Sequence, residues 1–204
     1  LICDKRKGDS DMDFKNMTVG ELKADLIKDA KKGYPFLLAG AFYWLVMGGL
    51  GFFIESQQQL ALFYLIGTCS IFPLAIAIGK IRKINLLSKN PLGALGGIIG
   101  GIQAFYIPVW VIIYIEQYEL IPMAIGILGA SHFLPYLWIY QSKTYGIFTI
   151  AMAAVSFIFG YVFINHAFML LPFLLCILYL LSVIALSFET KSFISIDERK
   201  GIGK

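Results

Sequence analysis

The chain has 204 residues, of which 58% are hydrophobic, and its formal net charge at pH 7 is +4. Soluble domains average about 45–50% apolar residues on a comparable count. The excess here is concentrated between Tyr34 and Phe188, in runs with few or no charges, which excludes an ordinary soluble domain. Two of the three cysteines lie inside these runs, so no disulfide framework is implied.

Residues 1–33 form a polar segment ahead of the first apolar run, and Met12 and Met17 are both plausible start residues. Within it, Thr18 and Glu21 have the spacing of a capping box, in which each side chain binds a backbone N–H of the other residue. Apolar side chains then recur on one helical face, which predicts a short amphipathic helix: Val19, Leu22, Leu26 and Ala30. This helix lies either on the cytoplasmic membrane surface or against the protein's own loops, and the sequence leaves both interpretations open.

Six apolar runs follow in succession, at about residues 35–54, 60–79, 92–115, 120–140, 145–164 and 167–188. Each has about 20 residues, the length that an α-helix needs to cross about 30 Å of hydrocarbon. Membrane strands are excluded because they alternate apolar and polar residues over about 10 positions. The sequence therefore predicts an all-α polytopic membrane protein, with a six-helix transmembrane bundle over 34–188 and a cytoplasmic tail over 189–204.

The 17 Lys and Arg residues alternate between the predicted loops. They lie before the first run, between the second and third, between the fourth and fifth, and after the sixth. The other three loops carry only Glu55, Glu116 and Glu119 as charges. By the positive-inside rule, both termini are predicted to be cytoplasmic, in the plasma (inner) membrane. The same alternation explains the positive net charge without nucleic acid as a partner.

Few polar side chains lie deep in the predicted spans, and none of them is Asp, Glu, Lys or Arg. Such groups usually face the bundle interior, because exposure to lipid is costly. The predicted substrate-binding residues are Gln103, His132, Tyr106, Tyr136 and Ser70. Gln103 and His132 lie in adjacent antiparallel helices and should face each other. The alternative is an interhelical hydrogen bond that only stabilises the bundle, by about 0.6 kcal/mol.

Two further patterns concern helix packing. Gly93, Gly97 and Gly101 recur at four-residue steps, which favours close helix contact, either inside the bundle or at a dimer interface. The internal contact is the preferred interpretation.

Segments 67–73 and 129–135 both carry Gly, then a polar residue three positions on, then Pro three positions later. Either the first helical hairpin is a degenerate copy of the second, or the match is the chance similarity that is common between apolar segments.

Enzyme, metal and cofactor chemistry find little support in the sequence. A zinc site needs several ligands at one depth, whereas the only two histidines, His132 and His166, lie at different depths. The sequence contains no Gly-rich phosphate loop ahead of a helix. Ser70 with His132 is conceivable as a catalytic dyad, but an orienting group and an oxyanion hole are not recognisable. We therefore predict no enzyme, no metal and no cofactor, with intramembrane catalysis left open.

Two segments resemble those of a known family. They are Asn90-Pro91-Leu92-Gly93, and His132-Phe133-Leu134-Pro135-Tyr136-Leu137-Trp138-Ile139-Tyr140. The family comprises small bacterial multi-pass membrane proteins with a domain of unknown function, and the similarity extends from about Gly20 to Phe188. The resemblance implies a membrane location and the helix count, but it implies no mechanism.

Two functions remain in competition. The leading hypothesis is transport or permeation of a small neutral or lipophilic molecule, or a subunit of such a system, because the interior has polar and aromatic groups but no buried charge. The alternative is a non-catalytic helper that binds membrane lipid, a partner membrane protein or a second copy. A cavity that reaches Gln103 and His132 would favour transport, and a filled bundle would favour the helper.

Overall fold

A computed structural model describes residues 14–202, and Met12 lies outside that range. The described part is all-α, without a strand. Its long helices are α1 Val19–Ala30, α2 Tyr34–Leu50, α3 Gln57–Thr68, α4 Ile71–Ile81, α5 Pro91–Gly101, α6 Ile107–Gln117, α7 Ile121–Ser131, α9 Lys143–Phe157 and α10 Leu170–Ile202. The short elements are η1 Phe14–Asn16, η2 Lys31–Gly33, η3 Ile102–Tyr106, η4 Tyr118–Leu120, α8 Tyr136–Ile139, η5 Ile158–Val162 and η6 Ile164–His166, of which η5 is a π-helix.

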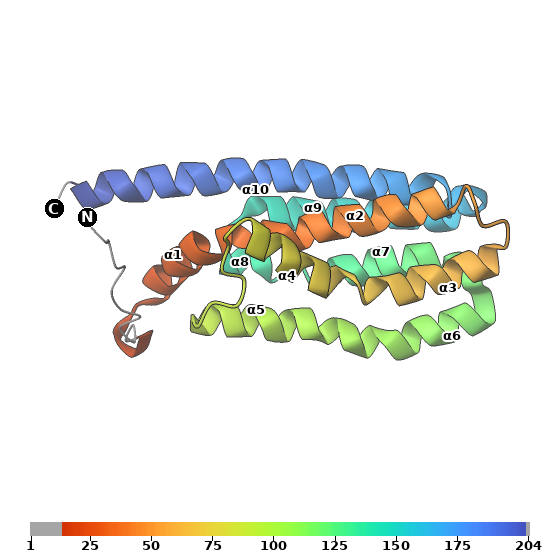
Figure 1. Cartoon of the computed structure of the whole chain (residues 1–204), viewed down its shortest axis with the longest axis horizontal. Coiled ribbons are helices and arrows are strands. Elements are labelled where there is room, and N and C mark those ends of the chain that lie inside the picture. The colour runs from red at the N-terminus through yellow and green to blue at the C-terminus, as the bar shows by residue number, and fades with distance from the viewer. Residues whose placement is uncertain (1–13, 203–204) are drawn as a thin grey trace, which may run out of the picture.

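The helices lie lengthwise in an elongated bundle, with α10 running along its full length (Figure 1). Within residues 14–202, four helical stretches are long and apolar enough to cross a membrane, or up to five if the bent pair α3–α4 counts as one span. One of the four, Pro91–Ile139, folds back on itself where Gln117 leaves the helical conformation (φ −152°, ψ 74°). Several apolar helices compatible with membrane insertion are thus confirmed.

Helices α2 and α10 form the most extensive helix–helix contact among the described residues. Gly40 lies directly beneath the Tyr179 ring, and an added Cβ there would overlap ring atoms. Trp44 and Tyr64 are almost fully buried beside this contact, with ring centroids 5.9 Å apart and an edge-on arrangement. Edge-on aromatic pairs of this kind are favourable beyond the area that they bury. Helices α3 and α4 pack against α2, and α9 packs against α10, around this contact.

The predicted apolar runs differ from the observed helices at their breaks and ends. Helices α3 and α4 meet at a 48° bend next to Cys69 and Ser70. The third run is interrupted by the 3₁₀ turn η3, and the fourth by a turn over 132–135 between α7 and α8. The last helix continues past Phe188 to Ile202. Continuous hydropathy cannot reveal such breaks, because a broken helix and a straight one use the same apolar residues.

The N-terminal helix α1 has the predicted capping box, with Glu21 N–H donating to the Thr18 hydroxyl and Thr18 N–H donating to the Glu21 carboxylate. Its buried side chains include Leu26 and Ile27. Asn90, fully buried, donates to the Leu22 carbonyl oxygen and the Asp25 carboxylate, both at 2.8 Å. Of the two interpretations left open by the sequence, the structure therefore shows α1 packed on the protein's own loop ahead of α5.

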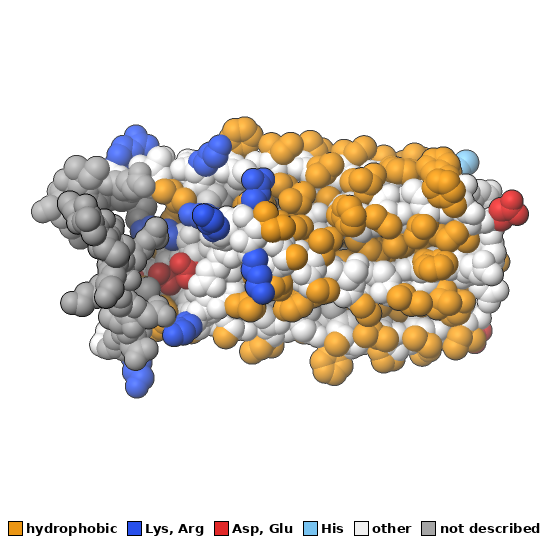
Figure 2. Space-filling view, in the orientation of Figure 1, with side chains coloured by type: hydrophobic (Ala, Val, Ile, Leu, Met, Phe, Trp, Pro, Cys, Tyr) orange, Lys and Arg blue, Asp and Glu red, His pale blue; other side chains and the backbone are white. Residues whose placement is uncertain are grey.

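Side chains sort along the length of the bundle. In the face drawn in Figure 2, an apolar band covers most of the surface, and Lys and Arg side chains gather at its left end, near α1 and the end of α10. Acidic side chains are visible at both ends, and a histidine lies at the end opposite the Lys and Arg side chains. A band of apolar surface between polar ends is the pattern of a membrane-spanning bundle.

Candidate functional site

The candidate site centres on a direct contact between Gln103 of η3 and His132, the residue that follows α7. The Gln103 amide nitrogen lies 2.9 Å from Nδ1 and 2.8 Å from Nε2 of the imidazole. It donates to whichever ring nitrogen is unprotonated, since a neutral imidazole has one acceptor. Both side chains are half-buried. The contact expected from the depths of the two residues is therefore present, between two neutral groups.

Two tyrosines extend this centre. The Tyr106 and Ser131 hydroxyls lie 2.9 Å apart, which adds Ser131 to the residues named from the sequence. The Tyr136 hydroxyl donates to the Gly96 carbonyl oxygen at 2.6 Å, and its ring meets the His132 ring edge-on at 6.4 Å between centroids. Side chains from η3, α7, the α7–α8 turn and α8 thus converge with the α5 backbone on one region.

Both helices of this region are interrupted at the level of the polar pair. The chain is 3₁₀ rather than α-helical over Ile102–Tyr106, and α7 ends at Ser131 before Pro135. Interrupted helices within a membrane expose backbone polar groups, which are tolerated where protein or a water-filled cavity surrounds them. Segment 67–73 contains the α3–α4 bend, so both copies of the Gly-polar-Pro pattern coincide with helix breaks.

The polar centre lies toward an edge of the bundle. In the apolar 18-residue stretch of Pro91–Ile139, only 11% is buried inside the bundle. In the corresponding stretch of Val19–Leu50, 56% is buried. Gly97 and Gly101 face open space, with nothing within 4 Å of an added Cβ, whereas Gly96 faces the Tyr136 ring. The prediction that the glycine pattern forms an internal helix contact is therefore wrong for Gly97 and Gly101. The inward face of α5 is the one that carries Gly96.

Ser70 does not join the candidate site. It is exposed, and its hydroxyl donates to the Gly67 carbonyl oxygen of the preceding turn at 2.6 Å. No hydrogen bond links it to Gln103 or His132 within residues 14–202. Ser and Thr commonly bond backward to their own helix in this way, so its place in the predicted site and in a dyad with His132 has no geometric support.

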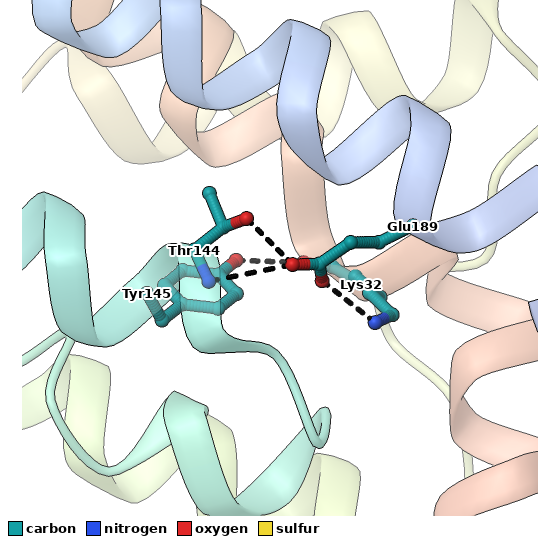
Figure 3. A network of polar contacts seen from close by, with 4 residues as sticks. All are labelled: Lys32, Thr144, Tyr145 and Glu189. Atoms are coloured by element: carbon teal, nitrogen blue, oxygen red, sulfur yellow. Dashed lines mark hydrogen bonds and ion pairs between the residues drawn. The ribbon is translucent and has the colours of Figure 1, made fainter.

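A second polar centre, which the sequence did not indicate, lies at the basic end of the bundle (Figure 3). The Lys32 ammonium lies 2.9 Å from Oε2 of Glu189, and the Thr144 hydroxyl donates to Oε1 at 2.6 Å. The Tyr145 hydroxyl donates to the Lys32 carbonyl oxygen at 2.6 Å. The Lys32 side chain is only 4% exposed. These contacts fasten η2, the start of α9 and α10 to one another.

The backbone around Lys32 is unusual. Lys31, Lys32 and Gly33 all have positive φ, of 48°, 56° and 67°. Two consecutive non-glycine residues in the left-handed region carry strain that only surrounding contacts can hold in place. The ion pair and the Tyr145 bond supply those contacts. The signal in the sequence was a lysine directly before a span and a glutamate directly after one, which hydropathy treats as loop charges.

A family model for a family of unknown function, DUF7010, matches residues 19–189. The chain belongs to this family. The match agrees closely with the extent of the resemblance stated from the sequence. No curated protein and no solved structure matches the chain. The DUF7010 domain thus includes α1, every apolar helix as far as Glu189, and both polar centres.

Two cavities of this DUF7010 chain lie elsewhere. One, of about 390 Å³, is a groove between α2, α4 and α10, and the other, of about 130 Å³, lies between α4 and the loop over 84–87. Neither is lined by Gln103 or His132. Among the described residues, no group of three or more His, Cys, Asp or Glu side chains could hold a metal ion.

Proposed function

We propose that the chain is a six-span protein of the plasma (inner) membrane with both termini in the cytoplasm. The passes are α2, α3–α4, α5–α6, α7–α8, α9 and α10, with Pro91–Ile139 counted as two because it reverses direction. An even number of passes agrees with α1 and the end of α10 lying at the same end of the bundle. The basic side chains at that end favour its cytoplasmic location.

Within this arrangement, the centre formed by Gln103 and His132 binds a small neutral or lipophilic molecule during its transport or permeation. The observation that carries the proposal is that two adjacent helices are both interrupted where their polar side chains meet. Interrupted helices near mid-membrane are the usual setting of transporter binding sites.

The chemistry of the centre favours a neutral substrate. Amide, imidazole and phenol groups donate and accept hydrogen bonds without carrying a fixed charge in their neutral forms. The predicted spans contain no deep carboxylate or ammonium to pair with an ion. A substrate hydroxyl or amide would replace the Gln103–His132 bond with bonds of its own to the same two groups.

The test is permeability of reconstituted liposomes to neutral solutes of increasing size, such as urea and glycerol, measured by stopped-flow light scattering. Wild type should admit at least one solute faster than empty liposomes do. His132→Leu should return the rate to that of empty liposomes. Thr149→Val is the matched control, because Thr149 is buried and, among the described residues, its hydroxyl bonds only within α9, to the Tyr145 carbonyl oxygen. A His132→Leu protein with the wild-type rate would refute the site.

The alternative function is a non-catalytic membrane helper that binds lipid or a partner membrane protein. One observation favours it: the two cavities described above do not reach the polar centre, and the larger one is apolar. A wild-type protein that admits no solute faster than empty liposomes would support the helper function.

A further inference from the structure

The larger cavity is an apolar groove on the outside of the bundle, between α2, α4 and α10. It has a volume of about 390 Å³, within the range of about 300–1,000 Å³ typical of small-ligand sites. Its lining consists of Leu38, Ala41, Phe42, Leu45, Leu74, Ile78, Cys176 and Leu180. The Cys176 thiol, a weak hydrogen-bonding group, is the only side chain of this lining that is not a hydrocarbon. The groove therefore suits a hydrocarbon chain better than a polar solute.

Arg82 lies at the basic end of α4, the helix that forms one wall of the groove. Arg82 N–H donates to the Ile78 carbonyl oxygen at 2.9 Å, so α4 keeps its helical turn as far as Arg82. Residues four apart lie on the same helical face, which places Arg82 one turn beyond Ile78 toward the basic end. Arg82 is exposed and forms no ion pair within residues 14–202. Lys80 and Lys83, also exposed, lie beside it in the chain.

We propose that this groove binds one anionic phospholipid, with an acyl chain between α2, α4 and α10 and the headgroup phosphate on Arg82. Along α4 the apolar groove comes first, and Arg82 follows it toward the basic end. A phospholipid has the same order, with an apolar acyl chain followed by a charged phosphate. Guanidinium groups bind phosphate through paired hydrogen bonds. A net-anionic headgroup is preferred over a zwitterionic one because it has no ammonium group that offsets the charge of the phosphate. The proposal rests on the six-span arrangement proposed above, but not on transport.

The first test compares headgroups. Purified protein is titrated with phosphatidylglycerol or phosphatidylcholine of identical acyl chains, and retained lipid is counted by native mass spectrometry. Wild type should retain one phosphatidylglycerol in preference to phosphatidylcholine. Arg82→Gln should reduce that preference about fivefold, which corresponds to the roughly 1 kcal/mol that one basic residue contributes near an anionic surface. Lys143→Gln is the control, since Lys143 is an exposed basic residue at the start of α9, outside the groove.

The second test fills the groove. Leu45 lines it and is 49% exposed, so Leu45→Trp adds bulk at the rim without repacking the core. Leu62, 42% exposed on α3, is the matched control because it does not line the groove. Leu45→Trp should lose the retained phosphatidylglycerol, and Leu62→Trp should keep it.

Three results would overturn the proposal. Equal loss in Arg82→Gln and Lys143→Gln would mean diffuse surface charge with no site. Equal retention in Leu45→Trp and Leu62→Trp would place the lipid outside the groove. A dimer mass that disappears in Leu45→Trp would identify a second copy as the occupant. Solute permeability is measured on the same preparations. A variant that loses lipid retention but keeps the wild-type permeability shows that the lipid proposal and the transport proposal can fail separately.

Discussion

The molecule has two polar centres, and they differ in charge, burial and the number of segments that they join. The contacts around Lys32 and Glu189 include a buried ammonium and hold η2, α9 and α10 together. The contacts around Gln103 and His132 are neutral, half-buried and lie toward an edge of the bundle. A buried charge that loses its partner is strongly destabilising, whereas a neutral pair can exchange its bond for one to a ligand. The comparison indicates a stabilising role for the first centre and agrees with the binding role proposed for the second.

The largest expected effect is therefore at the charged centre. Glu189→Leu leaves the Lys32 ammonium buried without a partner and should lower the free energy of unfolding by about 3 kcal/mol. Thermal unfolding in detergent measures this loss. Lys32→Met combined with Glu189→Leu should recover most of it, because no uncompensated charge remains. Glu116→Leu, an exposed acid at the other end of the bundle, should change little. Equal stability of Glu189→Leu and Glu116→Leu would contradict the role of the ion pair.

The next effect separates the packed centre of the bundle from its edge. Gly40→Ala places a methyl group against the buried Tyr179 ring and should cost about 1–3 kcal/mol, as overpacking does. Gly97→Ala meets nothing within 4 Å and should leave stability unchanged or slightly raised. Melting temperatures of the two variants in the same detergent give the comparison. A larger loss at Gly97 would mean that the exposed face of α5 is covered by a partner in the membrane.

A smaller effect is expected at the neutral centre. His132→Leu leaves the Gln103 amide without its partner and should cost about 1–2 kcal/mol. Replacing both residues by Leu should be closer to neutral, because no unpaired polar group remains. Unfolding of the single and double variants is measured alongside solute permeability. If the double variant were less stable than the single one, the pair would be structural and the binding role would lose its basis.

The smallest effect is expected at Ser70. Its hydroxyl bonds to the Gly67 carbonyl oxygen of its own helix and is exposed. Ser70→Ala should therefore change the free energy of unfolding by no more than about 0.5 kcal/mol. It should also leave solute permeability at the wild-type rate. A permeability loss as large as that of His132→Leu would return Ser70 to the site.

Sequence reasoning succeeded where a physical cost restricts the choices. Polar groups in lipid must find partners, and this requirement predicts the contact between Gln103 and His132. A capping box has a fixed spacing, and this predicted the contacts of Thr18 and Glu21. Both predictions depend on depth or spacing, which the sequence contains directly.

Sequence reasoning failed where the outcome depends on which face a helix turns inward. Gly97 and Gly96 are adjacent in the chain, yet only Gly96 faces Tyr136. The same limit applied to Ser70, whose hydroxyl had a nearer acceptor in its own helix. Lys32 and Glu189 were missed because they lie 157 residues apart at the ends of different spans. Lys32 was interpreted only as a loop charge that indicates the cytoplasmic side, so its contact with Glu189 was not predicted.

The six-span arrangement underlies both proposals, because it sets the depth of Gln103 and His132 and the membrane face of Arg82. Accessibility of single cysteines to an impermeant maleimide in intact cells tests it most directly. On a background without the native cysteines, Cys introduced at Gln57 and Tyr118 should label from outside, whereas Cys at Lys83 and Lys143 should label only after the membrane is opened. Labelling of position 83 in intact cells, or of position 118 only after opening, would contradict the arrangement.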